Sequence, residues 1–221
     1  ASTRELLVRS RSWKQNVDVI PLDEGFSLLF REIQGDHVVN RVEQQGSVHS
    51  TIVRSLDTLE IVYLGPSQDI EILSKDFIEQ GSNLRDSIDE DLYRIKRGHL
   101  TSSGLEQHRP IPLEVALDSD ISFTKGCYIG QEMIARLDAR GALARTSVTV
   151  ETDTEIPPGS QSLAGGGRII VMSSVEGNDS WWSACLVHPD VAHVGSSLHT
   201  KQLEGTSVEL NIRNRWKPSS D

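Results

Sequence analysis

Cysteine is scarce in this chain of 221 residues, which contains only Cys127 and Cys185. Two cysteines cannot build a disulfide-rich scaffold, so a reducing compartment is the default expectation. They also cannot supply the four protein ligands that the common iron–sulfur clusters need within one chain. We predict no metal site, because His188 and His193 flank Pro189 without metal-ligand spacing and without an accompanying cysteine pair.

Long apolar runs are also missing, and positive charge is in deficit. No run approaches the roughly 20 apolar residues of a membrane-spanning helix, and no apolar signal core follows the first basic residues. The 22 Lys and Arg face 32 Asp and Glu, a net charge of −10, and an acidic surface repels a phosphate backbone. We therefore expect no membrane partner, no nucleic-acid partner, and a cytoplasmic protein, or one of the mitochondrial matrix if the organism is eukaryotic.

The charge is distributed unevenly along the chain. Residues 94–145 carry eight Lys and Arg and six acids, so this segment is +2 while the remainder is −12. A basic strip on an acidic protein is typical of a site for an anionic small molecule, although a few solvated cations are the commoner explanation.

The first part of the chain has the mixed pattern of an α+β unit. Helical spacing predicts one helix from Ser67 to Gly81 and a second that begins at Ser87, with a capping box, and ends at Gly98. Residues 99–124 contain a glycine and two prolines and are predicted to be an extended segment. Strands are predicted at residues 17–20, 26–30, 48–53 and 59–64.

After residue 145 the pattern is all-β. The sequence predicts a small barrel or sandwich here, because short strand-like runs alternate with turns rich in glycine and proline. The runs are residues 146–150, 168–172, 182–187 and 207–212. The tail from Arg213 is expected to fray. We predict two domains, residues 1–144 and residues 145–221.

Residues 125–132 are the most informative stretch and read Lys-Gly-Cys-Tyr-Ile-Gly-Gln-Glu. They place Cys127 beside Lys125 at the predicted start of a helix that Gly141 ends. Free N–H groups, the positive end of the helix dipole and the Lys125 ammonium would favour thiolate over thiol. The alternative is a buried structural cysteine, the commoner environment of a free thiol. Cys185, in an apolar strand, is predicted to be the less reactive of the two.

The string around this octapeptide closely resembles the signature of the folate-binding aminomethyltransferase superfamily, whose best-known member is the glycine-cleavage T-protein. The resemblance is specific from residue 94 to residue 145, weaker from there to about residue 212, and poor before residue 48. Its upstream end, Arg94–Gly98, is similar to the superfamily's Arg-Ile-x-x-Gly helix end. The cysteine form of the motif is similar to the branch of folate-binding proteins that assist iron–sulfur cluster assembly and repair.

This resemblance implies an α+β fold in which part of a T-protein folate-binding body, ferredoxin-like in character, precedes a small C-terminal β-barrel. Residues 1–144 would then be the partial folate-binding domain. Tetrahydrofolate is the cofactor that the resemblance implies. Carboxylates and amides can meet its pterin edge, and arginine suits its glutamate tail. The implied site residues are Cys127 as a functional thiol, with Arg94, Lys125, Gln131, Glu132 and Arg136 as folate-binding residues.

Each of these residues also has an ordinary structural explanation. Gln131 and Glu132 are typical of a solvated first helical turn, and Arg94 is equally expected as a salt-bridged structural cation. Glu114, upstream of the octapeptide, is a further candidate for the pterin edge.

Three functions stay open at this point. The first is a folate-binding protein that supports iron–sulfur cluster assembly or repair, with client or assembly proteins as partners. The second is a folate-dependent aminomethyltransferase or demethylase, an enzyme of one-carbon transfer. The third is an interaction module that has lost folate. T-protein-like enzymes use an acidic residue of their first domain, and that domain is not recognisable here, so we assign no catalytic acid.

Overall fold

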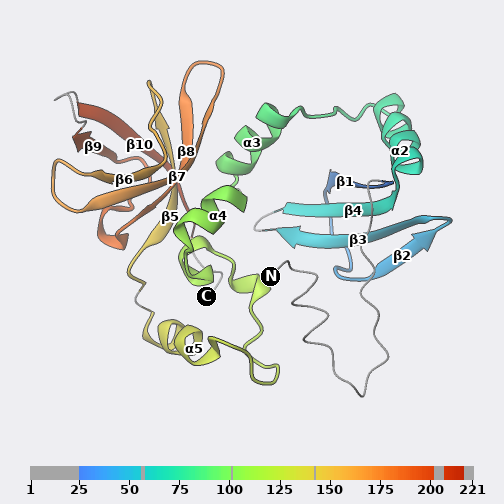
Figure 1. Ribbon diagram of the computed structural model, residues 1–221, viewed down its shortest axis with the longest axis horizontal. Helices are drawn as coiled ribbons and strands as arrows, with labels where there is room; N and C mark the ends of the chain where they lie inside the picture. The colour runs from blue at the N-terminus through green and yellow to red at the C-terminus, as the bar shows by residue number, and fades with distance from the viewer. Residues whose placement is uncertain (1–24, 56–57, 101, 142, 202–206, 217–221) are drawn as a thin grey trace. The chain divides into compact units, whose positions relative to one another are not determined.

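The computed structural model describes residues 25–55, 58–100, 102–141, 143–201 and 207–216 (Figure 1). The predicted strand at residues 17–20 lies outside these ranges. The chain divides into two compact units, residues 1–84 and residues 85–221. Each unit has its own sheet, and the mixture of helices and strands confirms the predicted α+β class. The predicted domain boundary at residue 145 stays a prediction.

The first unit is a four-stranded antiparallel sheet with one described helix. Its strands are β1 (Phe26–Ile33), β2 (Val42–Gln45), β3 (Val48–Ser55) and β4 (Thr58–Pro66), in the order β1-β4-β3-β2. Helix α2 (Ser67–Glu79) follows β4 directly and packs on β1 and β4. Its face carries buried Ile70, and the ring of Phe77 lies 5.5 Å from that of Tyr63.

The second unit joins five helical segments to a six-stranded sheet. The helical segments before the sheet are α3 (Ser87–Lys96), α4 (Ser102–His108), two short 3-10 turns η1 (Pro112–Val115) and η2 (Asp118–Asp120), and α5 (Gln131–Arg140). The strands are β5 (Thr146–Thr152), β6 (Gly159–Ser162), β7 (Arg168–Glu176), β8 (Trp181–Val187), β9 (Ser197–Lys201) and β10 (Ser207–Trp216). A third 3-10 turn, η3 (Pro189–Val191), lies between β8 and β9.

The six-stranded sheet curls into a nearly closed barrel. Its strand order is β6-β7-β8-β5-β10-β9, and the two edges meet where Leu163 bridges to Thr200 and the Ala164 N–H donates to the His199 carbonyl at 2.8 Å. Twelve fully or almost fully buried residues from the strands and their connections form one core cluster. A second cluster, including Ile95, Val115 and Leu186, joins the helical segments to β7 and β8.

Several local predictions are corrected by this structure. Residues 99–124 are not wholly extended, since α4 forms before Pro110 and Pro112 begins the turn η1. Helix α3 is capped by Asp86, whose carboxylate accepts the N–H groups of Ile88 and Asp89, and not by Ser87. The tail does not fray at residue 213, because pairing with β5 continues β10 to residue 216.

The C-terminal end of α3 docks on the barrel through hydrogen bonds and a close approach. The Thr149 hydroxyl donates to the carbonyl of buried Ile95 at 2.9 Å, which satisfies one of the free carbonyls at a helix end. The Trp216 indole N–H donates in turn to Thr149 Oγ1 at 3.1 Å. Gly98 has a φ of +77°, and a Cβ at this position would overlap the Trp216 ring. The Arg94–Gly98 motif therefore has a structural role.

We expect Gly98→Ala to destabilise the second unit, because alanine brings both left-handed strain and a clash with Trp216. Gly195→Ala is the matched control, since Gly195 has a φ of +83° but nothing within 4 Å of its Cβ position. Overpacking costs about 1–3 kcal/mol, so Gly98→Ala should lower the free energy of unfolding by about that much more than Gly195→Ala. Urea denaturation followed by tryptophan fluorescence measures both, and equal losses would contradict the packing role.

Acidification should remove the contribution of Glu151 on β5. Hydrogen bonds from Ser180 Oγ and Arg213 Nε, both at 2.6 Å, hold the pKa of Glu151 below its ordinary value, with Ser180 the larger cause. A lowered folded-state pKa stabilises the protein above the unfolded-state pKa, about 4.3, and this stabilisation is lost as the pH falls through the folded value. The urea midpoints of wild type and Glu151→Gln should differ at pH 7 and converge near pH 3. A constant gap would overturn this assignment.

Candidate functional site

Cys127 lies on an exposed loop ahead of α5, not at the first turn of the helix. The helix begins at Gln131, and Gly130 precedes it in the left-handed conformation with a φ of +88°. The influence of a helix dipole falls off within the first turn, so the predicted activation of Cys127 by the helix start loses its geometric basis. Cys127 is exposed and Cys185 is buried.

Lys125 takes part in the local structure of this loop. Its N–H donates to Ser122 Oγ at 3.1 Å, and its ammonium lies 4.9 Å from the centre of the Tyr128 ring. An ammonium over an aromatic face is attracted by the ring quadrupole. The positive charge nearest to Cys127 in sequence is therefore held over Tyr128.

A hollow of about 860 Å³ lies beside Cys127 and α5. Cys127, Gln131, Glu132 and Arg136 all line it, whereas Arg94 and Lys125 do not. Every lining residue comes from residues 127–140, so this segment forms a single wall of an open site. The thiol, amide, carboxylate and guanidinium thus share one surface.

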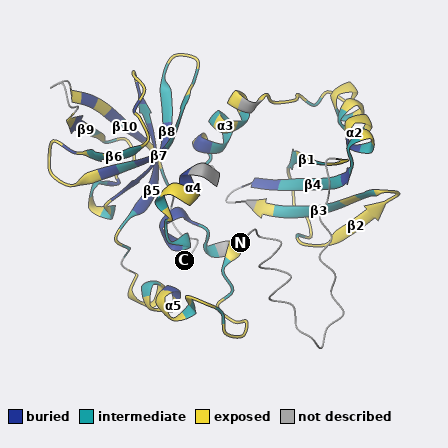
Figure 2. Ribbon diagram, in the orientation of Figure 1, coloured by how far each residue is buried: buried dark blue, intermediate teal, exposed yellow. Residues whose placement is uncertain are grey.

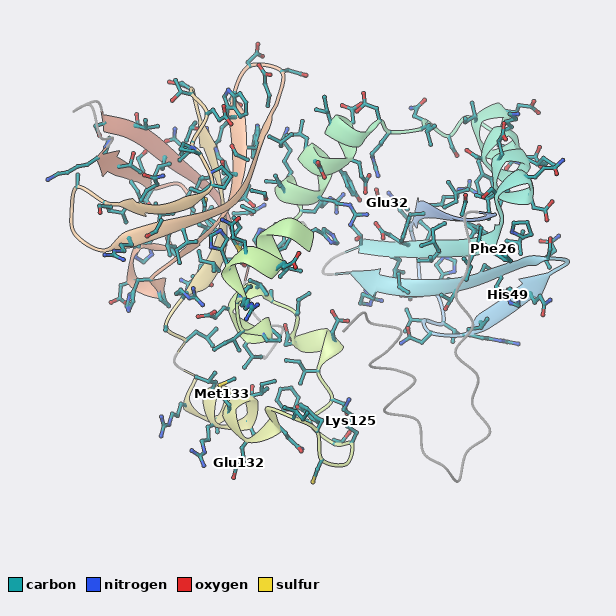
Figure 3. The ribbon with its side chains drawn as sticks, viewed as in Figure 1. Phe26, Glu32, His49, Lys125, Glu132 and Met133 are labelled. Carbon is teal, nitrogen blue, oxygen red and sulfur yellow. The ribbon has the colours of Figure 1, made fainter. Side chains whose placement is uncertain are left out.

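The segment that carries this hollow is exposed over most of its length (Figure 2). Ile134 is the buried residue of α5. Two other large apolar side chains of the segment are exposed to solvent: Ile129 fully and Met133 to 52%. Figure 3 shows Met133 with Lys125 and Glu132 on this segment. Met133 lies on the hollow together with the charged groups of Glu132 and Arg136.

The two arginines of the predicted site have different environments. Arg136 lies 3.7 Å from Glu132 across one helical turn, with 69% and 90% of the two side chains exposed. Such a pair is weak and leaves both groups available to a ligand. Arg94 is on α3, where its Nε lies 2.7 Å from Glu90 and both side chains are about two-thirds covered. The structure therefore assigns Arg94 an ion-pair partner within its own helix.

Glu114 proves to be structural, which sequence reasoning did not anticipate. Its side chain is only 2% exposed and accepts two hydrogen bonds from Arg145, at 2.9 and 2.7 Å, and one from the Ile111 N–H at 3.0 Å. A forked arginine bond of this kind satisfies a buried carboxylate. Glu114 is therefore occupied by protein groups and is not directed at a ligand.

Within the ranges that the structure describes, no group of three or more His, Cys, Asp or Glu is arranged to hold a metal ion. None of the described helices is both long and apolar enough to cross a membrane.

Comparisons with known proteins show a T-protein fold. No family model matches the chain. The glycine cleavage system aminomethyltransferase T of Bartonella henselae superposes with a TM-score of 0.58 at 16% identity, over 81% of this chain and 52% of that protein. The chain thus spans about half the length of this solved structure. The predicted resemblance to the aminomethyltransferase fold is confirmed.

Two short sequence matches accompany this structural likeness. One is 43% identical over 61 residues to the iron-sulfur cluster assembly factor IBA57 homolog, mitochondrial, of Eremothecium gossypii, covering 26% of this chain and 13% of that protein. The other is 50% identical over 40 residues to an uncharacterized protein of Haemophilus influenzae, covering 18% of this chain and 14% of that protein. Both relatives are matched over a small part of their length.

Alkylation should separate the two cysteines. We expect iodoacetamide at neutral pH to modify Cys127 first, because Cys127 is exposed, whereas complete burial raises the pKa of Cys185. Mass spectrometry of the digested protein measures both rates, and Cys127→Ser should remove the fast reaction. Equal rates in the folded protein would show that the thiols do not differ in access.

Proposed function

We propose that this chain is a folate-binding protein of the aminomethyltransferase superfamily that supports iron–sulfur cluster assembly or repair. The observation that carries the proposal is the shared surface of exposed Cys127 with Gln131, Glu132 and Arg136. The T-protein fold and the partial match to an iron-sulfur cluster assembly factor homologue support it.

The side chains that line the hollow include the chemical groups needed to bind tetrahydrofolate. Gln131 and Glu132 offer an amide and a carboxylate, which can meet the donors and acceptors of a pterin edge, and Arg136 offers a guanidinium for the carboxylates of a glutamate tail. Lys125 lies on the same loop but outside the hollow, with its ammonium over the Tyr128 ring. When bound, tetrahydrofolate supplies a carrier for one-carbon units. In this proposal the chain's own residues bind and orient it.

Cys127 gives the proposed site its second property. A thiolate can bind a soft metal or attack an electrophile, and an exposed one can be reached by another protein. One cysteine cannot hold a cluster alone, so the proposed role is in assembly or repair on a client or assembly protein. The exposed side chains of Ile129 and Met133 offer apolar contact area beside the thiol.

The two other functions each have an observation in their favour. The likeness to aminomethyltransferase T favours a folate-dependent aminomethyltransferase or demethylase, although no residue of the described site can be assigned as the catalytic acid. The single wall of the hollow favours an interaction module without folate. Folate affinity separates the third function from the other two, and one-carbon transfer to or from folate separates the enzyme from the assembly factor.

Calorimetric titration with tetrahydrofolate tests the proposal. Arg136→Ala should weaken binding about two- to fivefold, the range expected for an exposed charged contact, and the loss should be larger for polyglutamylated ligand. Added salt should reduce this difference, because it screens attraction between exposed charges. Arg94→Ala measures separately whether α3 contributes to binding.

Arg168→Ala is the matched control, since Arg168 is an exposed arginine at the start of β7 and lies outside the hollow. It should leave folate affinity unchanged. The folate proposal is falsified if the folded wild-type chain shows no affinity at millimolar tetrahydrofolate.

A further inference from the structure

The segment that carries Cys127 lies within the second unit, between η1 and β5. Glu114 lies in η1, just before the segment, and Arg145 immediately precedes β5, just after it. The two residues are 31 positions apart in sequence, yet their side chains are joined by two hydrogen bonds. This ion pair therefore closes the base of the loop formed by residues 117–144.

Core packing holds this loop mainly at its start, where partly buried Leu117 packs against the cluster that contains Ile95 and Val115. Ile134 is the one buried residue between 117 and 144 among those whose burial is described. The backbone hydrogen bonds described within residues 120–141 run to near neighbours in the chain, as from Ile134 to Gly130. Few buried contacts and local hydrogen bonds are the features of a segment that opens independently of the core.

The base of the loop is built differently from the loop itself. Leu113, Val115 and Ala116 are buried beside Glu114, and Val115 belongs to the cluster that joins the helical segments to β7 and β8. The Arg145 fork fixes the carboxylate in a plane, and the Ile111 N–H fixes it from a third direction. A bidentate pair specifies geometry as well as energy.

We infer that Glu114 and Arg145 are positioning residues for the Cys127 surface. Through this pair the barrel sets the place of the loop and so the arrangement of Cys127, Gln131 and Arg136. Weakening the pair should loosen residues 117–144 while the barrel stays folded. Its predicted effect on folate affinity rests on the proposed function, whereas its effect on the loop does not.

Hydrogen–deuterium exchange of the full chain tests the effect on the loop. Glu114→Gln keeps the shape and an acceptor for the Ile111 N–H but removes the charge, and Arg145→Lys keeps the charge but loses the fork. We expect exchange in α5 to become about tenfold faster in Glu114→Gln and to change less in Arg145→Lys. Glu151→Gln is the matched control, because it breaks an Arg–Glu pair between the neighbouring barrel strands β5 and β10.

Glu151→Gln should leave exchange in α5 unchanged. Alkylation of Cys185 reports whether the barrel stays folded, and it should stay as slow as in wild type in Glu114→Gln and Arg145→Lys. If exchange in α5 is unaffected by both variants, or if Cys185 becomes reactive together with the loop in both, the positioning role is overturned. In the second case the pair belongs to the barrel core.

Folate affinity is a second measurement, and a change in the stability of the fold would not by itself alter it. At a temperature where all variants are folded, Glu114→Gln should bind tetrahydrofolate about tenfold more weakly than wild type, as expected for misplaced binding groups. Arg145→Lys should lose less affinity than Glu114→Gln. Glu151→Gln should bind tetrahydrofolate as tightly as wild type. Equal affinity in wild type and Glu114→Gln would overturn the positioning role and leave the folate proposal standing. Absence of binding in wild type would overturn the folate proposal, and the exchange experiment would still decide the role of the pair.

Discussion

The ion pair of buried Glu114 with half-buried Arg145 is the constraint on which the arrangement around Cys127 depends. A carboxylate with 2% exposure is stable only when its charge and lone pairs are satisfied, and here Arg145 and the Ile111 N–H satisfy them. Removing Arg145 would leave the buried carboxylate without its charged partner, which destabilises the folded state. The same pair brings together the two ends of an otherwise exposed loop, so it links the stability of the barrel unit to the geometry of the candidate site.

A second set of contacts holds helix α3 against the barrel strands. Thr149 on β5 connects the end of α3 to the last strand, since its hydroxyl donates to Ile95 and accepts from Trp216. Gly98 leaves room for the indole ring. The Arg-Ile-x-x-Gly motif thus serves the docking of α3 on the barrel, and its arginine is paired with Glu90 within the helix. A motif shared with a folate-binding superfamily need not contact folate at every position.

The candidate site itself has the character of a contact surface. Its thiol, amide, carboxylate and guanidinium lie on one exposed segment, beside apolar side chains that no described residue buries. This arrangement accommodates both parts of the proposed function. The polar groups suit a folate, while the exposed thiol and apolar residues suit a second protein. The fold alone does not choose between an assembly factor and a transferase, and the chemistry of Cys127 carries that distinction.

By itself the sequence determined what depends on local periodicity. Strand-like runs bounded by turn residues predicted β1, β3, β4 and the four longest barrel strands. Helical spacing predicted α2 and α3, because the buried face of a helix repeats every 3.6 residues. The apolar neighbours of Cys185 likewise placed it in a strand, which is β8. Tertiary structure decided whatever depends on partners distant in sequence. Strands β2 and β9 are short and largely polar and are defined by their neighbours, β10 extends because β5 pairs with it, and Glu114 is occupied by Arg145. Periodicity shows which face of a helix or strand is buried. It does not show which charged side chain on a distant segment will form an ion pair with a residue of that element.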